Sequence, residues 1–115
     1  MIKKLLLIII LLSVAILHIF ITRRKVYIEQ IDEYKKYSAR IEWKRVFPYI
    51  QGVNAYLVVE NISNKKVVID KILLQDRDVF EDIKFEIIGI KWEGDYIKLI
   101  LNRGHYNGPA IFLVK

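Results

Sequence analysis

The feature that most constrains this chain is an uninterrupted apolar stretch near its N-terminus. Residues Leu5 to Ile21 include no charged residue, and their only polar ones are Ser13 and His18. As a helix this stretch is about 25 Å long, the short end of what a bilayer core of about 30 Å requires. A helix in a protein core normally keeps one polar face, and this stretch has none. We therefore predict a membrane-spanning segment over 5–21.

Basic residues stand on both sides of the apolar stretch. Residues 1–4 form a charged N-terminal flank, and a second basic group follows residue 22. Long basic side chains can extend their charges to the headgroup region, and such a collar is attracted to anionic lipid. We interpret the following as membrane-flanking residues: Lys3, Lys4, Arg23, Arg24 and Lys25.

Two alternatives concern the use of this segment. Ser13-Val14-Ala15 has the small residues of a signal-peptidase site, and cleavage after Ala15 would release a secreted binding domain. The apolar run continues to Ile21, however, and a mature secreted protein seldom begins with such a run, which favours an uncut signal anchor.

The basic flanks are nearly balanced, so they favour the two orientations of the chain in the membrane almost equally. A signal-like N-terminus before a long domain slightly favours an extracytoplasmic domain.

The rest of the chain divides into a basic stalk and a β-rich domain. In residues 25–37 the apolar positions recur near helical period, which favours a helix or short helical stalk within a juxtamembrane region 22–38. Val26 and Ile28 also alternate briefly as in a strand. From Arg40 onward the period changes to two, which indicates strands. Strands are expected within 40–45, 53–59, 67–74, 84–92, 96–101 and 110–114, with a helical turn near 79–83.

The expected fold is an N-terminal transmembrane helix followed by a small, mainly-β domain over 39–115. About six strands form an antiparallel meander, arranged as a sandwich or half-barrel. The absence of cysteine excludes disulfides, thiolate metal sites and a cysteine nucleophile, so the core must be aliphatic and aromatic. We expect Trp43 and Trp92 to anchor this core. A fragment that begins at about Ser38 should then fold alone.

Residues that could carry chemistry are few. Outside the apolar segment the only histidine is His105, and a hydrolase would need Ser38 or Ser63 beside it, neither of which lies in a nucleophile motif. An acidic group lacks the spacing of a calcium loop and is interpreted as a partner surface: Asp76, Asp78, Glu81 and Asp82. The sequence predicts no enzyme and no catalytic, cofactor-binding or metal-binding residue. A hydrolase using His105 is the least favoured alternative.

The net charge of +6 is unevenly distributed. Residues 22–45 carry a balance of +4 and residues 76–95 a balance of −4. A nucleic-acid-binding protein would spread basic residues over its folded domain, so we expect no nucleic acid and infer no small-molecule ligand. The layout resembles that of small bacterial envelope proteins with one N-terminal anchor, a resemblance that implies no activity.

We therefore expect a single-pass membrane-anchored β-domain that acts by binding, as an accessory or immunity-type protein. Its partners would be membrane lipid, through the N-terminal helix, and a protein. The last strand, Ala110 to Val114, is predicted to lie at a sheet edge, where unpaired backbone groups can accept a partner strand.

Overall fold

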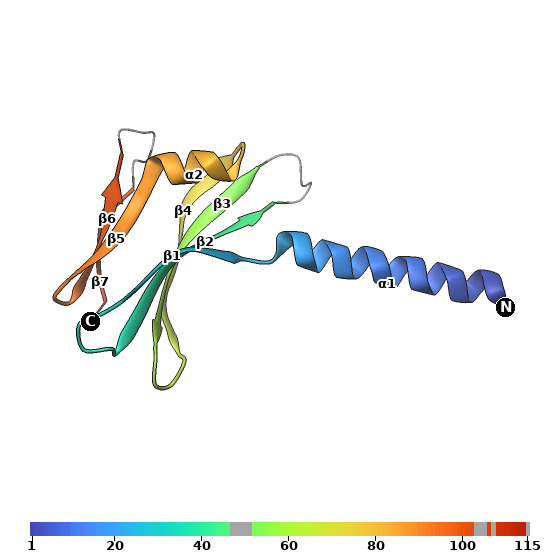
Figure 1. Ribbon diagram of the computed structural model, residues 1–115, viewed down its shortest axis with the longest axis horizontal. Helices are drawn as coiled ribbons and strands as arrows, with labels where there is room; N and C mark the ends of the chain where they lie inside the picture. The colour runs from blue at the N-terminus through green and yellow to red at the C-terminus, as the bar shows by residue number, and fades with distance from the viewer. Residues whose placement is uncertain (47–51, 103–105, 107, 115) are drawn as a thin grey trace.

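The computed structural model describes residues 1–46, 52–102, 106 and 108–114, and of residues 21 and 22 only the backbone. A long helix projects from one end of a β domain (Figure 1), which confirms the predicted fold class. The elements are α1 (Ile2–Thr22), β1 (Lys25–Ile31), β2 (Tyr37–Arg45), β3 (Val53–Asn61), β4 (Val67–Arg77), α2 (Phe80–Glu86), β5 (Ile87–Glu93), β6 (Tyr96–Leu101) and β7 (Ile111–Leu113).

Helix α1 contains the predicted membrane segment and extends it at both ends. Residues 2–20 form a helix long and apolar enough to cross a membrane, and all their side chains are exposed. The hydroxyl of Ser13 donates a hydrogen bond to the carbonyl of Ile9 at 2.8 Å, so this polar group is satisfied inside the helix. The helix therefore does not serve as a core helix of the domain.

The strands form two antiparallel sheets. The first sheet has the order β1-β2-β3-β4 and the second the order β5-β6-β7. Each is a meander, because strands that follow one another in the sequence lie side by side. Sharp turns allow this: the β5–β6 turn contains Gly94 at a φ of +62°, a value that glycine adopts without steric cost.

Strand β1 corrects the prediction of a helix over 25–37. It pairs with β2 from Lys25 opposite Trp43 to Ile31 opposite Ser38. A β-bulge between Val26 and Ile28 interrupts the alternation of side chains. The shift in alternation leaves the apolar residues spaced as they would be in a helix, which explains the error.

Helix α2 is longer than the predicted helical turn near 79–83. It begins where a carboxylate oxygen of Asp82 accepts a hydrogen bond from the Val79 N–H at 3.3 Å. It continues to Glu86, so the strand expected from Lys84 starts at Ile87 instead. The other predicted strands lie within a few residues of their observed bounds.

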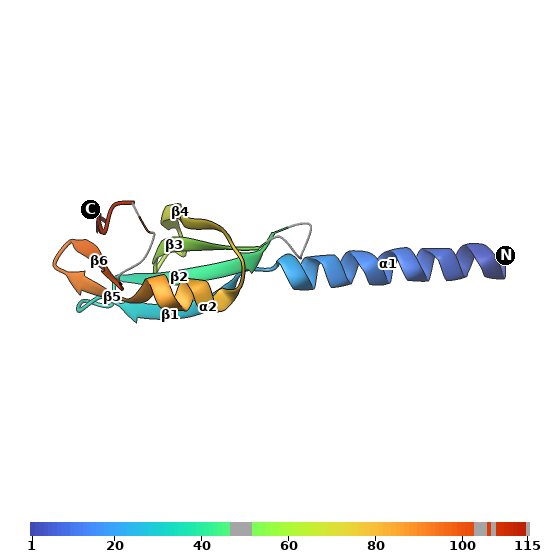
Figure 2. The same cartoon turned by 90° about the horizontal axis from the view of Figure 1, so that it is seen from above.

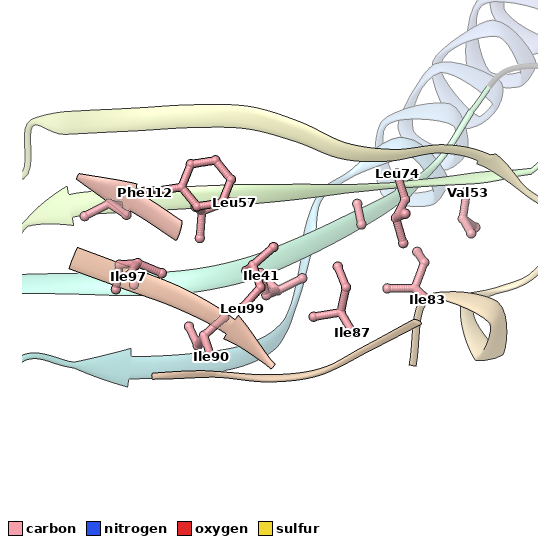
Figure 3. Packing of buried hydrophobic residues seen from close by; sticks show 13 residues of the cluster. Ile41, Val53, Leu57, Leu74, Ile83, Ile87, Ile90, Ile97, Leu99 and Phe112 are labelled. Atoms are coloured by element: carbon pink, nitrogen blue, oxygen red, sulfur yellow. The ribbon is translucent and has the colours of Figure 1, made fainter. Parts of the chain in front are cut away.

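The core lies between the two sheets, with α2 closing one end (Figure 3). Its members are at most 6% exposed. They are Ala39, Ile41, Val53, Ala55, Leu57, Val59 and Leu74 from the first sheet, Ile83 from α2, and Ile87, Ile90, Ile97, Leu99 and Phe112 from the second. Trp43 and Trp92 are half-buried and pack against this cluster, as predicted.

In the described part of the chain, the sandwich is closed along one side. There β1 lies beside β5: the Tyr27 hydroxyl donates to the carbonyl of Ile87 at 3.2 Å, and the Trp92 indole donates to the carbonyl of Gln30 at 3.0 Å. The strands at the other side, β4 and β7, are the outer strands of their sheets. The domain is thus a sandwich with two joined edges and two separate ones.

Candidate functional site

The five membrane-flanking residues do not share one environment, and Arg24 differs from the rest. Its Nη1 lies 3.0 and 3.2 Å from the two carboxylate oxygens of Asp70, and 3.6 Å from a carboxylate oxygen of Glu42. Its guanidinium carbon lies 3.8 Å from the ring centroid of Tyr56. These partners stand on β4, β2 and β3. Arg24 therefore links the end of α1 to three strands of the first sheet.

The charged surface around Arg24 continues along the outer face of this sheet. Arg40 donates hydrogen bonds to Glu42 and, at 3.2 Å, to Glu60. Burial lowers the pKa of Arg40, but the hydrogen bonds and charges of both glutamates outweigh this and raise it above its usual value. Although they face away from the core, Tyr56 and Val58 are only 5% and 3% exposed. Long charged side chains thus cover an apolar strip on this face.

The remaining flanking residues are exposed. Lys3 and Lys4 are exposed on the first turn of α1. Arg23 forms no ion pair with any residue that the structure describes, and the ammonium of Lys25 lies 4.9 Å from the ring centroid of Trp43. A hollow of about 360 Å³ occupies the junction of α1 and β1, lined by Phe20, Arg23, Arg24, Lys25 and Val26.

The four acidic residues interpreted as a partner surface have different structural environments. Asp82 caps α2, and Asp76 has a φ of +55° and donates its N–H to the Asn54 side chain at 3.0 Å. Asp78 and Glu81 are exposed. Among the residues described, no group of three or more histidines and acids could hold a metal ion.

A buried ion pair between β4 and α2 lies beside these acids and was not anticipated from the sequence. Glu86 is 4% exposed and accepts two hydrogen bonds from the guanidinium of Arg77, one of them at 3.0 Å. The hydrogen bond to Glu86 raises the pKa of Arg77 above its usual value. The pair fixes the end of α2 against the end of β4.

The residues considered for hydrolysis have structural contacts where they are described. The Ser38 hydroxyl donates to a carboxylate oxygen of Glu29 at 3.1 Å, and the Ser63 hydroxyl donates to the Asn61 side chain at 2.8 Å. His105 lies outside the described residues. Both serine hydroxyls therefore support local structure, in the β1–β2 pair and in the β3–β4 turn.

Strand β7 lies at a sheet edge, where the segment 110–114 was predicted to be. The Leu99 N–H donates to the Ala110 carbonyl at 2.8 Å, and the Val114 N–H donates to the Asp95 carbonyl at 2.9 Å. In an antiparallel ladder, residues that bond to the partner strand alternate with residues whose N–H and C=O groups point away from it. Ile111 and Leu113 alternate with the bonded positions and therefore turn both groups away from β6, to a side where no described strand pairs with them.

An exposed apolar face adjoins this edge. On the outer side of the second sheet, five large apolar side chains are at least 43% exposed: Ile88, Tyr96, Ile100, Ile111 and Leu113. Lys91 and Lys98 lie opposite each other among them. The sequence could not reveal this face, because isoleucine is abundant on both sides of these strands.

Comparisons of this chain with protein-family models, with curated proteins and with solved structures found no match. The interpretation of these surfaces therefore rests on their own geometry.

Proposed function

We propose that this protein is a single-pass, membrane-anchored β-domain that acts by binding a protein, in an accessory or immunity-type role. The exposure of α1 supports the anchor. Large apolar side chains from Ile2 to Phe20 are exposed on every side of the helix, and each would be stabilised by transfer from water to lipid. In this proposal the domain stands on the extracytoplasmic side.

The observation that carries partner binding is the free edge of β7. A partner strand could pair with the outward N–H and C=O groups of Ile111 and Leu113, whose side chains are 55% and 57% exposed. The second sheet lies at the end of the domain away from α1 (Figures 1 and 2). A strand added there would meet no bilayer.

The other outer strands are less suited to this role. β1 and β5 lie beside each other and cover each other's edges. β4 contains register shifts opposite β3, and Asp76 near its end has a positive φ. Lys71 of β4 is exposed, with its ammonium 5.9 Å from the ring centroid of Phe112. Bulges and lysines on an edge strand discourage strand addition.

The acidic residues would act by steering. In this proposal Asp76, Asp78, Glu81 and Asp82 attract a basic partner and raise its association rate more than its affinity. Reversing the exposed charges at Asp78 and Glu81 should then slow association and leave the folded domain intact. An unchanged association rate would remove these acids from the proposed surface.

A matched pair of lysine substitutions tests the edge. Leu113→Lys places a charge on the β7 edge, and Val68→Lys makes the same change at an exposed position of β4. We expect pull-downs from native membranes to lose the partner with Leu113→Lys and to keep it with Val68→Lys. Leu113→Pro should behave like Leu113→Lys, because it removes an outward N–H without breaking a bond to β6. Equal recovery with all variants would contradict the proposal.

The anchor is tested separately. Full-length protein should remain in the membrane fraction after carbonate extraction, and its intact mass should include the N-terminal residues. A mature chain that begins at Ile16 would instead identify a cleaved signal and a secreted binding domain.

A further inference from the structure

A hollow of about 260 Å³ lies between the two sheets at the end of the domain farthest from α1. Its lining comes from the β1–β2 turn, the β5–β6 turn and the residue that follows β7. The lining residues are Asp32, Tyr34, Lys36, Tyr37, Trp92, Gly94, Asp95 and Val114. Both turns stand opposite α1 in Figures 1 and 2, so the hollow is at the membrane-distal end of the anchored protein.

The floor of this hollow is aromatic and held in place. The rings of Tyr37 and Trp92 stack with centroids 6.4 Å apart. The indole N–H of Trp92 already donates to the carbonyl of Gln30, so this residue offers a ring and no hydrogen-bond donor. Tyr34 stands on the rim with 83% of its surface exposed. A ligand would therefore meet aromatic surfaces on the floor and at the rim.

Two carboxylates, those of Asp32 and Asp95, line the hollow. One carboxylate oxygen of Asp32 holds the β1–β2 turn, accepting hydrogen bonds from the N–H groups of Lys36 and Tyr37 at 2.6 and 3.1 Å. The carboxylate of Asp95 has no hydrogen bond or ion pair within the described part of the chain. A group that donates hydrogen bonds and carries positive charge would complement this set.

The chain's own Lys36 shows that the aromatic floor attracts a cation. Its ammonium lies 5.6 Å from the ring centroid of Tyr37, within the range of a cation–π contact. The Lys36 side chain is exposed, so a competing cation could displace it at little cost to the fold.

From this geometry we infer that the hollow receives an arginine side chain of the protein partner. The inference rests on the proposed function, because it names the group by which that partner is recognised. A guanidinium is planar, stacks on aromatic rings and donates parallel hydrogen bonds to a carboxylate. In the hollow the guanidinium stacks on the ring of Tyr37, pairs with the carboxylate of Asp95 and displaces the ammonium of Lys36.

The test uses full-length protein in lipid nanodiscs with Trp92 as the reporter. Trp43→Phe leaves Trp92 as the only tryptophan and keeps an aromatic ring against Phe80. The probes are a short peptide with one arginine and the same peptide with citrulline, which has nearly the same shape and no charge. We expect a saturable change in Trp92 emission with arginine and binding about tenfold weaker with citrulline.

Two further substitutions should act in opposite directions. Asp95→Asn should weaken arginine-peptide binding about fivefold, because it removes the carboxylate charge. Lys36→Met should strengthen binding about threefold, because it removes the competing cation. Glu29→Gln, an exposed acid on β1 that does not line the hollow, is the matched control and should leave the affinity unchanged. A purely structural role of these residues would not give opposite signs, and near-UV circular dichroism confirms that each variant is folded.

Equal binding of both peptides, absence of binding, or a change in the same direction for Asp95→Asn and Lys36→Met would overturn the inference. The edge proposal has its own readout. Partner recovery that depends on Leu113 but is indifferent to Asp95 would refute the arginine site and leave the proposed function standing. Partner recovery that depends on neither Leu113 nor Asp95 would refute both the edge proposal and the arginine site.

Discussion

Arg24 is the residue through which the helix and the domain meet. A basic residue beside a membrane segment is expected at the lipid surface. Here the Arg24 guanidinium instead has a carboxylate at 3.0 Å and an aromatic ring at 3.8 Å. An ion pair from one guanidinium nitrogen to both carboxylate oxygens, combined with a cation–π contact, is stronger than either alone, because one ordered side chain serves both.

Arg24→Ala should destabilise the domain, whereas Arg23→Ala should not. Loss of the contacts to Asp70 and Tyr56 should lower the free energy of unfolding by about 1–2 kcal/mol, since the pair is partly exposed. Urea denaturation followed by tryptophan fluorescence measures this difference. Equal stability of the two variants would show that the Arg24 contacts contribute nothing.

Glu86 makes the opposite kind of ion pair, because its carboxylate is buried. Glu86→Gln removes the charge that balances Arg77 and should cost roughly 2 kcal/mol. Glu81→Gln, an exposed change of the same chemistry on the same helix, should change stability by less than about 0.5 kcal/mol. The same denaturation assay compares them, and a similar loss for both would mean that Glu86 is not a structural partner of Arg77.

For single residues, the sequence allowed a location near the membrane to be predicted, but not the residues that each one contacts. The membrane-flanking residues were identified from their position after an apolar run, a local signal. The partner of Arg24, Asp70, is 46 residues away, and only the pairing of β2, β3 and β4 brings it near. The same holds for the aromatic hollow, whose Tyr37 and Trp92 come from different sheets.

Among the elements, β1 is the one whose role the sequence concealed. It forms an outer strand of the first sheet, and its Tyr27 ring contacts Phe80 with centroids 5.3 Å apart. The remaining strands were predictable because apolar residues recur at every second position, as at Val53, Ala55, Leu57 and Val59. The bulge in β1 removed that alternation. The edge position of 110–114 was predicted, whereas the outer positions of β1 and β4 depend on the order of strands in the first sheet and were not readable.

Truncation at two positions tests the contribution of β1. A fragment from Lys25 onward should fold, because it keeps every strand and lacks only α1 and the two residues after it. The sequence alone led us to expect that a fragment from Ser38 would fold. Because this fragment lacks β1 and exposes the edge of β2, we now expect it to unfold or aggregate. Chemical-shift dispersion in amide NMR spectra distinguishes them. Well-dispersed spectra from both fragments would make β1 dispensable.

For the whole molecule, orientation is the property that reporter fusions can measure. The last described residue, Val114, lines the hollow together with the β1–β2 and β5–β6 turns, which stand opposite α1 (Figure 1), so a C-terminal fusion should not disturb α1. With the domain across the membrane, a phosphatase fused there should be active and a fluorescent protein dim. The reverse pattern would place the domain in the cytoplasm.

The junction of α1 and β1 has a consequence for how far the molecule can reach. Only Arg23 and Arg24 separate the two elements, and Arg24 is fastened to the sheet. A domain joined to its anchor by a flexible linker can take many distances and orientations relative to the bilayer. The two-residue junction and the Arg24 contacts instead restrict this domain to one orientation relative to α1. The long axis measures 63 Å, of which α1 accounts for about 31 Å. If α1 spans a bilayer, as proposed, the domain would reach surfaces within about 30 Å of the lipid.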